Sequence, residues 1–234
     1  MGRLRLMLLA GAVAGLGLGA TMAPAMADPF DTTFTVNVWN FKCPNCTITK
    51  ASQQALPTNP QATSANHVFT NATYTGAMNF DLGSGDTDTI GAFFTSGGGT
   101  GTAGLLSSTK TLSTGTYNGS RDLWTTLMSF SFTIAASTNA IFHDDGISLF
   151  DSSGTNLLPA ADANPTAEDE SDITLAAGSY TLWYVEANGL PAVLEFETTP
   201  NTPVPEPGSL ALLGTGLAGL GMLGFAVRKR RPTA

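Results

Sequence analysis

The sequence predicts an all-β protein, built as an antiparallel β-sandwich, with an apolar segment at each end of the chain. Three observations lead to this prediction. Apolar and polar residues alternate with a period of two along most of the chain, which is typical of strands with one buried face. Short clusters rich in Gly, Asn and Asp separate these runs, as tight turns do. Sustained 3.6-residue periodicity does not occur outside the two apolar ends.

The N-terminal segment has the order of a secretory signal peptide. Basic residues precede an apolar stretch at Leu6–Ala20, and Ala25 and Ala27 supply the small side chains that signal peptidase requires. We therefore expect cleavage after Ala27. This cleavage would remove residues 1–27 as a signal peptide and leave residues 28–203 as one exported domain.

About eight short strands are expected in the exported domain. In the run at 34–38, for example, Phe34, Val36 and Val38 alternate with polar neighbours. The predicted strands are 34–38, Ala72–Phe80, Ile90–Phe94, Met128–Ile134, Ile147–Phe150, Ile173–Leu175, Tyr180–Val185 and Ala192–Glu197. Many short strands joined by Gly and Asn turns favour a sandwich of the jelly-roll or lectin-like type.

Two longer stretches are expected to be surface loops. Pro57–Asn66 and Asp151–Asp172 are rich in Pro, Ala, Asn and acidic residues, a composition that is typical of loops. The acidic cluster at Glu168–Asp172 lies in the second stretch. Because it lacks the Gly and Asx spacing of a calcium-binding loop, we expect solvated side chains there.

The C-terminal segment combines three features in a fixed order. A short motif comes first, made of Val204, Pro205, Glu206 and Pro207. The apolar run Gly208–Val227 follows, and its twenty residues, at about 1.5 Å per residue, are long enough to span a hydrocarbon core of roughly 30 Å as a helix. Four basic residues come last: Arg228, Lys229, Arg230 and Arg231. Basic flanks stay in the cytoplasm, so the domain upstream would lie outside the membrane.

This order resembles the PEP-CTERM sorting signal of Gram-negative bacteria, and residues 204–234 match all three of its parts. The resemblance implies processing by an exosortase, a membrane protease-transpeptidase that acts at or near the Pro-Glu-Pro. The protein would be held transiently in the inner membrane and would then reach the cell surface or the extracellular matrix. A plain single-pass tail anchor, with Pro205 and Pro207 ending the helix, is the alternative.

The charge of the exported domain limits its partners. Residues 28–203 contain four basic residues against 17 acidic ones, a formal net charge of −13. A surface this acidic repels nucleic acid and anionic lipid, so we expect neither as a partner. Divalent cations and neutral glycans, including extracellular polysaccharide, remain compatible with it.

Asp144 and Asp145 precede Gly146 at the mouth of a predicted strand, where adjacent carboxylates can direct oxygen ligands at one cation. With the later Gly-Ser-Tyr at 178–180 and the stretch at 186–192, this motif resembles the protective-antigen-type β-sandwich over about 130–198. In lectin-like members of that family the Asp pair holds Ca²⁺, which in turn binds sugar hydroxyls. Three interpretations stay open: an Asx-type turn, a structural Ca²⁺ site and a Ca²⁺ site that binds glycan.

The only two cysteines, Cys43 and Cys46, form a Cys-x-x-Cys motif. Export to an oxidising compartment favours a disulfide between them. Redox catalysis would require a βαβ context, which the sequence lacks. Zinc would require two further ligands, and His67 and His143 are the only histidines, neither at the spacing of a zinc finger.

The sequence assigns no catalytic residue. His143 beside Asp144 can be drawn as part of a Ser-His-Asp triad, but no Gly-x-Ser-x-Gly marks a nucleophile. The leading hypothesis is an exported structural or adhesive protein of the cell envelope or extracellular matrix, processed by signal peptidase and exosortase. A Ca²⁺-dependent glycan-binding module is the alternative, and a secreted hydrolase is the third hypothesis. Ca²⁺ is the one candidate cofactor.

Overall fold

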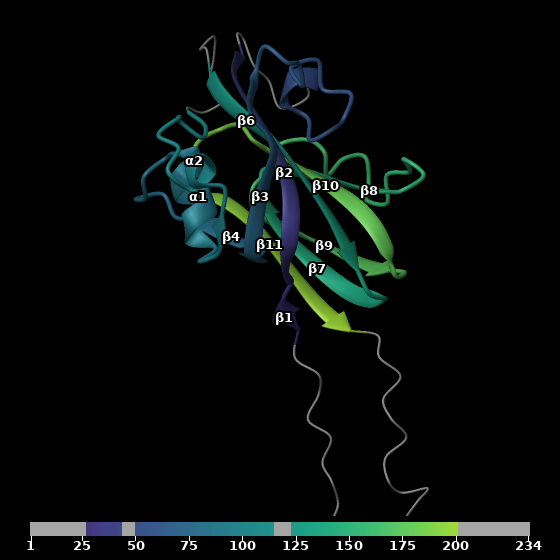
Figure 1. The fold of residues 1–234 in the computed structure, drawn as a ribbon. Helices are drawn as coiled ribbons and strands as arrows, with labels where there is room; N and C mark the ends of the chain where they lie inside the picture. The colour runs from purple at the N-terminus through teal and green to yellow at the C-terminus, as the bar shows by residue number, and fades with distance from the viewer. Residues whose placement is uncertain (1–26, 44–49, 115–122, 201–234) are drawn as a thin grey trace, which may run out of the picture.

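Two antiparallel β-sheets pack face to face in the computed structural model of the chain (Figure 1). The structure describes residues 27–43, 50–114 and 123–200. Residues 1–26 of the expected signal peptide, Cys46 and the C-terminal sorting segment lie outside these residues, and their roles stay predictions. Within the described residues, no helix is both long enough and apolar enough to span a membrane.

The first sheet has five strands and contains the chain ends of the described domain. Its order is β1–β11–β7–β9, with β4 also paired to β11, and every pairing is antiparallel. The strands are β1 (Asp28–Pro29), β4 (Asn79–Leu82), β7 (Ser137–Asp144), β9 (Asp169–Leu175) and β11 (Ala192–Pro200). Because β1 pairs with the last residues of β11, the two ends of the described domain lie side by side.

The second sheet has six strands in the order β5–β3–β2–β6–β10–β8. The strands are β2 (Asp31–Cys43), β3 (His67–Ala77), β5 (Thr100–Gly101), β6 (Leu123–Ile134), β8 (Gly146–Asp151) and β10 (Gly178–Glu186). The prediction of antiparallel sheets is therefore confirmed. Six of the eight predicted strands lie within single observed strands, and Ala72–Phe80 covers parts of β3 and β4.

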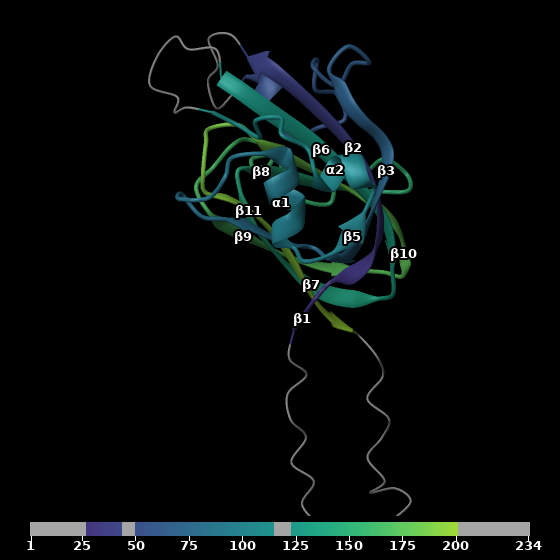
Figure 2. The ribbon, with the colours of Figure 1, turned by 60° about the vertical axis from the view of Figure 1, so that its left-hand side comes forward.

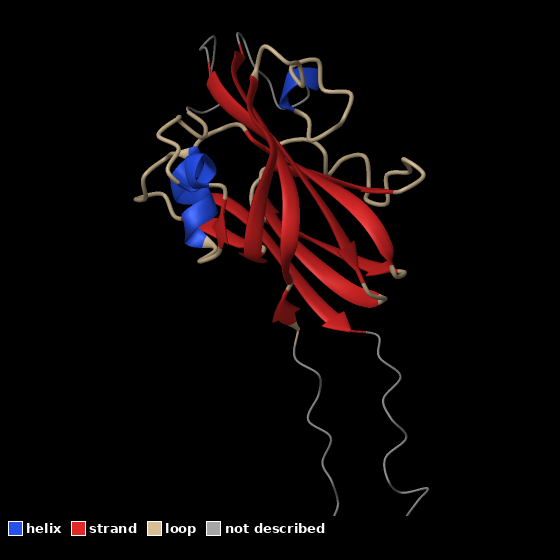
Figure 3. Ribbon diagram, in the orientation of Figure 1, coloured by secondary structure: helices blue, strands red, loops and turns tan. Residues whose placement is uncertain are grey.

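The prediction of a strand at Ile90–Phe94 is wrong. These residues belong to the helix α1 (Ile90–Ser96), which packs with α2 (Ala103–Leu106) beside β4 (Figure 3). The Thr89 side chain caps α1 by accepting a hydrogen bond from the Ala92 N–H at 3.1 Å. Ile90, Phe93 and Phe94 are fully buried. Their i, i+3, i+4 spacing gives one apolar helix face.

Two other strand assignments differ from the prediction. The acidic residues from Asp169 to Asp172 form the start of the edge strand β9 rather than part of a solvated loop. The strand β7 was not predicted, because its inward positions carry Ser137, Asn139 and His143 beside Ile141, all at most 2% exposed. Polar residues at buried positions conceal the alternation of apolar and polar residues on which strand prediction depends.

Aromatic side chains fill the space between the sheets. Phe130 and Phe132 of the six-stranded sheet lie 5.8 Å and 5.7 Å, between ring centroids, from Phe80 and Phe196 of the five-stranded sheet. Burial of one such side chain contributes about 1.5–3 kcal/mol. This aromatic layer sets the spacing of the two sheets. It thereby also sets the distance that the chain covers where it crosses from β7 to β8.

A second, smaller apolar cluster covers the upper part of the outer face of the six-stranded sheet. It includes Trp39, Leu127 and Val185, and Ala55 from the segment after the 3₁₀ turn η1 (Ala51–Gln53) packs on it. The segment is fixed by a hydrogen bond from the Ser148 hydroxyl to the Ala55 carbonyl. The lower part of the same face, nearer β1 and the ends of the described domain, lies outside this cluster. Figure 2 shows β1 at that end of the sandwich.

Candidate functional site

Asp144 and Asp145 lie where the chain crosses from one sheet to the other. Asp144 ends β7 in the five-stranded sheet, and Gly146 begins β8 in the six-stranded sheet. The peptide bond between the two aspartates is cis. Asp144 is 6% exposed and Asp145 is fully buried. A Cβ at Gly146 would lie 2.6 Å from the Ala163 carbonyl oxygen, so glycine is required at this crossing.

The Asp145 carboxyl group has one satisfied oxygen and one unsatisfied oxygen. Oδ2 accepts a hydrogen bond of 2.8 Å from the Ala187 N–H, which lies after β10. Oδ1 is buried and has no hydrogen-bond partner. Asp145 thus contacts a segment distant in sequence, whereas an Asx-type turn bonds to neighbouring backbone. A buried carboxyl oxygen without a partner is costly to desolvate, by about 1–3 kcal/mol.

Glu186, the last residue of β10, is a third buried carboxyl beside the Asp pair. Its Oε1 accepts a hydrogen bond of 2.7 Å from the Ser113 hydroxyl. Its Oε2 lies 2.8 Å from the Tyr184 hydroxyl, which is also within hydrogen-bonding distance of the Asp144 carbonyl. Tyr184 therefore links Glu186 to the backbone of the Asp pair. We call Asp144, Asp145 and Glu186 the carboxyl cluster.

Glu186, Tyr184 and Ser113 were not among the site residues predicted from the sequence. A signal for Glu186 was nevertheless present. Alternate residues of β10 that precede it, among them Leu182 and Tyr184, point into the core, and Glu186 occupies the next inward position. A carboxylate at an inward position of a strand is rare unless it has a specific partner. Ser113 gave no such signal, because the fold brings it from another part of the chain.

His143 lies next to the cluster but is not arranged as a catalytic base. Its Nδ1 lies 2.6 Å from the Asp145 carbonyl oxygen. Since a carbonyl only accepts, Nδ1 carries the proton and donates it. The imidazole thus pairs with a backbone carbonyl, whereas the base of a Ser-His-Asp triad pairs with a carboxylate. His143 Nε2 is buried without a hydrogen-bond partner.

Burial makes the carboxyl cluster resist ionisation. It raises the pKa of Asp144 to about 6, with a further contribution from the negative charge of Glu168. Burial also raises the pKa of Asp145 well above its ordinary value, although the Ala187 N–H opposes the rise. The pKa of Glu186 is raised well above its ordinary value for the same reason, and the charge of Asp145 adds to the rise. A bound cation would reverse these shifts, because it stabilises the ionised form.

The residues fit Ca²⁺ as two carboxylate ligands of a larger oxygen set. Ca²⁺ takes six to eight oxygens, among them backbone carbonyls and water. Asp145 Oδ1 supplies a buried oxygen without a partner, and Asp144 lies next to it in sequence. In the described part of the chain, no group of three or more His, Cys, Asp or Glu side chains is arranged to hold a metal. The remaining ligands would be other oxygens, such as main-chain carbonyls and water.

The acidic residues near the start of β9 form a separate surface feature. Glu168, Asp169 and Glu170 line an open hollow of about 340 Å³ together with Phe142. All three acidic side chains are exposed. Their only described link to the carboxyl cluster is the charge of Glu168, which acts on Asp144.

Cys43 lies at the end of β2, is 1% exposed and is disulfide-bonded. The Ser52 hydroxyl is 3.0 Å from its Sγ. Cys46, the predicted disulfide partner, lies outside the described residues.

Comparison with known proteins does not identify a family. No family model matches the chain, and no curated protein matches it. A PA14 sugar-binding domain from an RTX adhesin is 19% identical, with a TM-score of 0.42 over 73% of this chain and 90% of the other. The PA14 domain of the MpAFP antifreeze protein is 15% identical, with a TM-score of 0.37 over 76% and 88%. Similarity at this level leaves the function to be argued from the chain itself.

Proposed function

We propose that the protein is an exported component of the cell envelope or extracellular matrix, with a structural or adhesive role among polysaccharides. The observation that carries this proposal is the ordered C-terminal segment, which runs from Val204 through the apolar stretch to Arg231. The fold is compatible with it, because the last described strand ends at Pro200, shortly before the motif. The segment could therefore be cut without loss of any described strand.

Processing can be tested in a Gram-negative host that produces the full chain with a C-terminal epitope tag, with and without an exosortase. We expect the tag to be lost, and the protein to leave the inner membrane, only when the exosortase is present. Replacing Pro205, Glu206 and Pro207 with alanine should abolish both effects. A matched control replaces Asn201 and Thr202 instead. Equal processing of the two variants would refute sorting through the Pro-Glu-Pro motif.

A second candidate function is Ca²⁺-dependent glycan binding at Asp144 and Asp145. The observation that favours it is the buried Asp145 Oδ1 without a partner, next to a second carboxyl and near a third. When bound, Ca²⁺ would supply the positive charge that offsets the ionised carboxylates and open coordination positions for sugar hydroxyls. Asp144 and Asp145 would hold the ion, while Tyr184 and Ala187 hold the backbone and side chain of the pair in place.

Retention on immobilised extracellular polysaccharide tests this second function. We expect retention in millimolar Ca²⁺, release by EDTA, and loss of the Ca²⁺-dependent part in the variant Asp144→Asn with Asp145→Asn. The control variant is Asp172→Asn with Glu197→Gln, which removes two charges from the outer face of the five-stranded sheet. If EDTA does not reduce retention, or if both variants behave alike, the Asp pair is not a Ca²⁺-dependent glycan site.

A further inference from the structure

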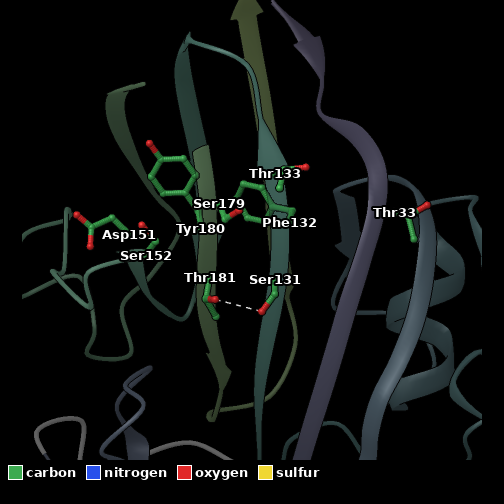
Figure 4. A pocket seen from close by; sticks show the side chains of 9 residues that line it. All are labelled: Thr33, Ser131, Phe132, Thr133, Asp151, Ser152, Ser179, Tyr180 and Thr181. Carbon is green, nitrogen blue, oxygen red and sulfur yellow. Dashed lines mark hydrogen bonds between the residues drawn. The ribbon is translucent and has the colours of Figure 1, made fainter. Parts of the chain in front are cut away.

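Hydroxyl side chains dominate the lower outer face of the six-stranded sheet. They occupy outward positions on four neighbouring strands and form three cross-strand pairs: Thr33 with Thr75, Ser131 with Thr181, and Thr133 with Ser179. We call these six residues the hydroxyl field. The Oγ atoms of Thr33 and Thr75 are 2.9 Å apart. Those of Ser131 and Thr181 are 3.1 Å apart (Figure 4). These contacts hold the side chains in defined orientations at a sheet surface that is accessible to solvent.

All residues of the field except Thr75 line an open hollow of about 370 Å³, together with Phe132, Asp151, Ser152 and Tyr180 (Figure 4). The pairing of β2 with β6 reaches only as far as Thr35 opposite Ser131. Before that point the chain turns toward the other sheet, where Asp28 and Pro29 pair with β11. β2 therefore parts from β6, and Thr33 and Thr133 both line the hollow that opens between them. The hollow is thus a result of the topology of the sandwich.

The two outer faces of the sandwich differ in charge. No member of the hydroxyl field is charged, and Asp31 and Asp151 lie at its edges. The Asp151 carboxylate already accepts hydrogen bonds from the Ser153 N–H and hydroxyl and from the Thr155 N–H, which lower its pKa. The outer face of the five-stranded sheet instead carries acidic side chains: Asp81, Glu170, Asp172, Glu195 and Glu197.

The chemistry of the hydroxyl field selects one kind of occupant. Each hydroxyl both donates and accepts a hydrogen bond, as do the hydroxyls of a neutral sugar. An anionic polymer would be repelled by the net charge of the domain, and a cationic one would prefer the acidic face. A protein partner would require a broad apolar centre, whereas Phe132 and Tyr180, the two aromatic residues that line the hollow, are largely buried. Half-buried Phe150, directly opposite Thr181, places an aromatic ring at the margin, as is common in small-molecule sites.

We propose that the hydroxyl field is a binding surface for a neutral polysaccharide chain and that it works without a metal ion. It is separate from the Asp pair, which lies at the opposite end of the sandwich. The proposal rests on the proposed extracellular location of the protein, but it does not require Ca²⁺. The protein would then have two distinct means of contact with a polysaccharide matrix, and only one of them would respond to calcium.

The test uses the mature protein purified from producing cells and the neutral fraction of their extracellular polysaccharide, separated by anion exchange. Retardation of the protein in a native gel that contains this fraction and EDTA measures affinity. We expect Thr33→Val with Thr181→Val to weaken binding about tenfold or more, because two hydroxyls are lost while the shape is kept. The matched control, Thr138→Val with Thr174→Val, alters a cross-strand pair in the other sheet and should bind normally.

The possible outcomes separate this proposal from the functions above. Absence of retardation in EDTA, or equal weakening by the two valine variants, would overturn the hydroxyl field as a binding surface. Retardation that requires Ca²⁺ and disappears in Asp144→Asn with Asp145→Asn would also overturn it, while it would support the Asp pair as the glycan site. Failure of either kind leaves the exosortase experiment unaffected. If the first variant does not fold, Thr133→Val with Ser179→Ala replaces it, since both positions are exposed.

Discussion

Adding Ca²⁺ to the metal-free protein should raise its melting temperature, and the rise should be larger at pH 7.5 than at pH 5. Ca²⁺ at a hundred times its Kd adds about 2.7 kcal/mol to the free energy of unfolding. For a domain of this size, each kcal/mol corresponds to about 2–4 °C, so the expected rise is about 5–10 °C. The measurement is a set of melting curves of the purified protein, with millimolar Ca²⁺ or with EDTA, at both pH values.

The dependence on pH follows from the buried carboxyl cluster. The pKa of Asp144 is raised to about 6 in the folded protein, against about 3.9 in an unfolded chain. The folded state therefore keeps this proton to higher pH than the unfolded state does. In EDTA, the contribution of Asp144 to stability should be largest below about pH 4 and should decrease up to about pH 6, by at most about 3 kcal/mol. The raised pKa values of Asp145 and Glu186 act in the same direction.

Ca²⁺ binds the ionised carboxylates, so it competes with protons and offsets the loss of stability at higher pH. The variant Asp144→Asn with Asp145→Asn should show no rise with Ca²⁺ and a weaker pH dependence in EDTA. The control Asp172→Asn with Glu197→Gln should respond as the unmodified protein does. Coincident melting curves in Ca²⁺ and EDTA at pH 7.5, or a rise that survives in the Asp144 and Asp145 variant, would refute the metal site.

Three further predictions concern stability, and melting curves or denaturant titrations measure all of them. Gly146→Ala should cost about 1–3 kcal/mol, because its Cβ would meet the Ala163 carbonyl at 2.6 Å; Gly85→Ala, with no atom within 4 Å, should be nearly neutral. Glu186→Ala should cost about 1–3 kcal/mol, since the buried Ser113 hydroxyl loses its acceptor while the Tyr184 hydroxyl keeps the Asp144 carbonyl, whereas Glu186→Gln should cost much less. Thr89→Ala should cost about 1 kcal/mol by removing the cap of α1. Equal effects within either matched pair, or no effect at Thr89, would contradict the respective contact.

The strands could be predicted where one face is apolar and the other polar. Phe34, Val36 and Val38 are fully buried, and their polar neighbours in β2 are more exposed, as the alternation indicates. The prediction was wrong at Ile90–Phe94, where a short apolar run fits a strand or a single helix turn equally well and the Thr89 cap decides the outcome. It omitted β7 because buried polar residues such as His143 interrupt the pattern.

Only part of the candidate site could be predicted from local sequence. Asp144 and Asp145 stand out because they are adjacent and precede a glycine. Glu186 reaches the site through the pairing of β10 with its neighbouring strands. Ser113 is joined to Glu186 by a hydrogen bond between residues 73 positions apart, which no local pattern encodes. The hydroxyl field is distributed in the same way, since Thr33, Ser131 and Thr181 are unremarkable singly and become an array only when the sheet aligns them.

The pairing of β1 with the end of β11 determines how an anchored molecule would stand. Pro200 lies opposite Ser137, and Val193 lies opposite Asp144, so the Asp pair is about 23 Å along the sheet from the last described residue. If residues 201–234 hold the chain at a membrane, the pole with the carboxyl cluster points away from the lipid. The hydroxyl field, next to the chain ends, would face the space close to the bilayer. Such a molecule would contact polysaccharide at two different heights above the membrane.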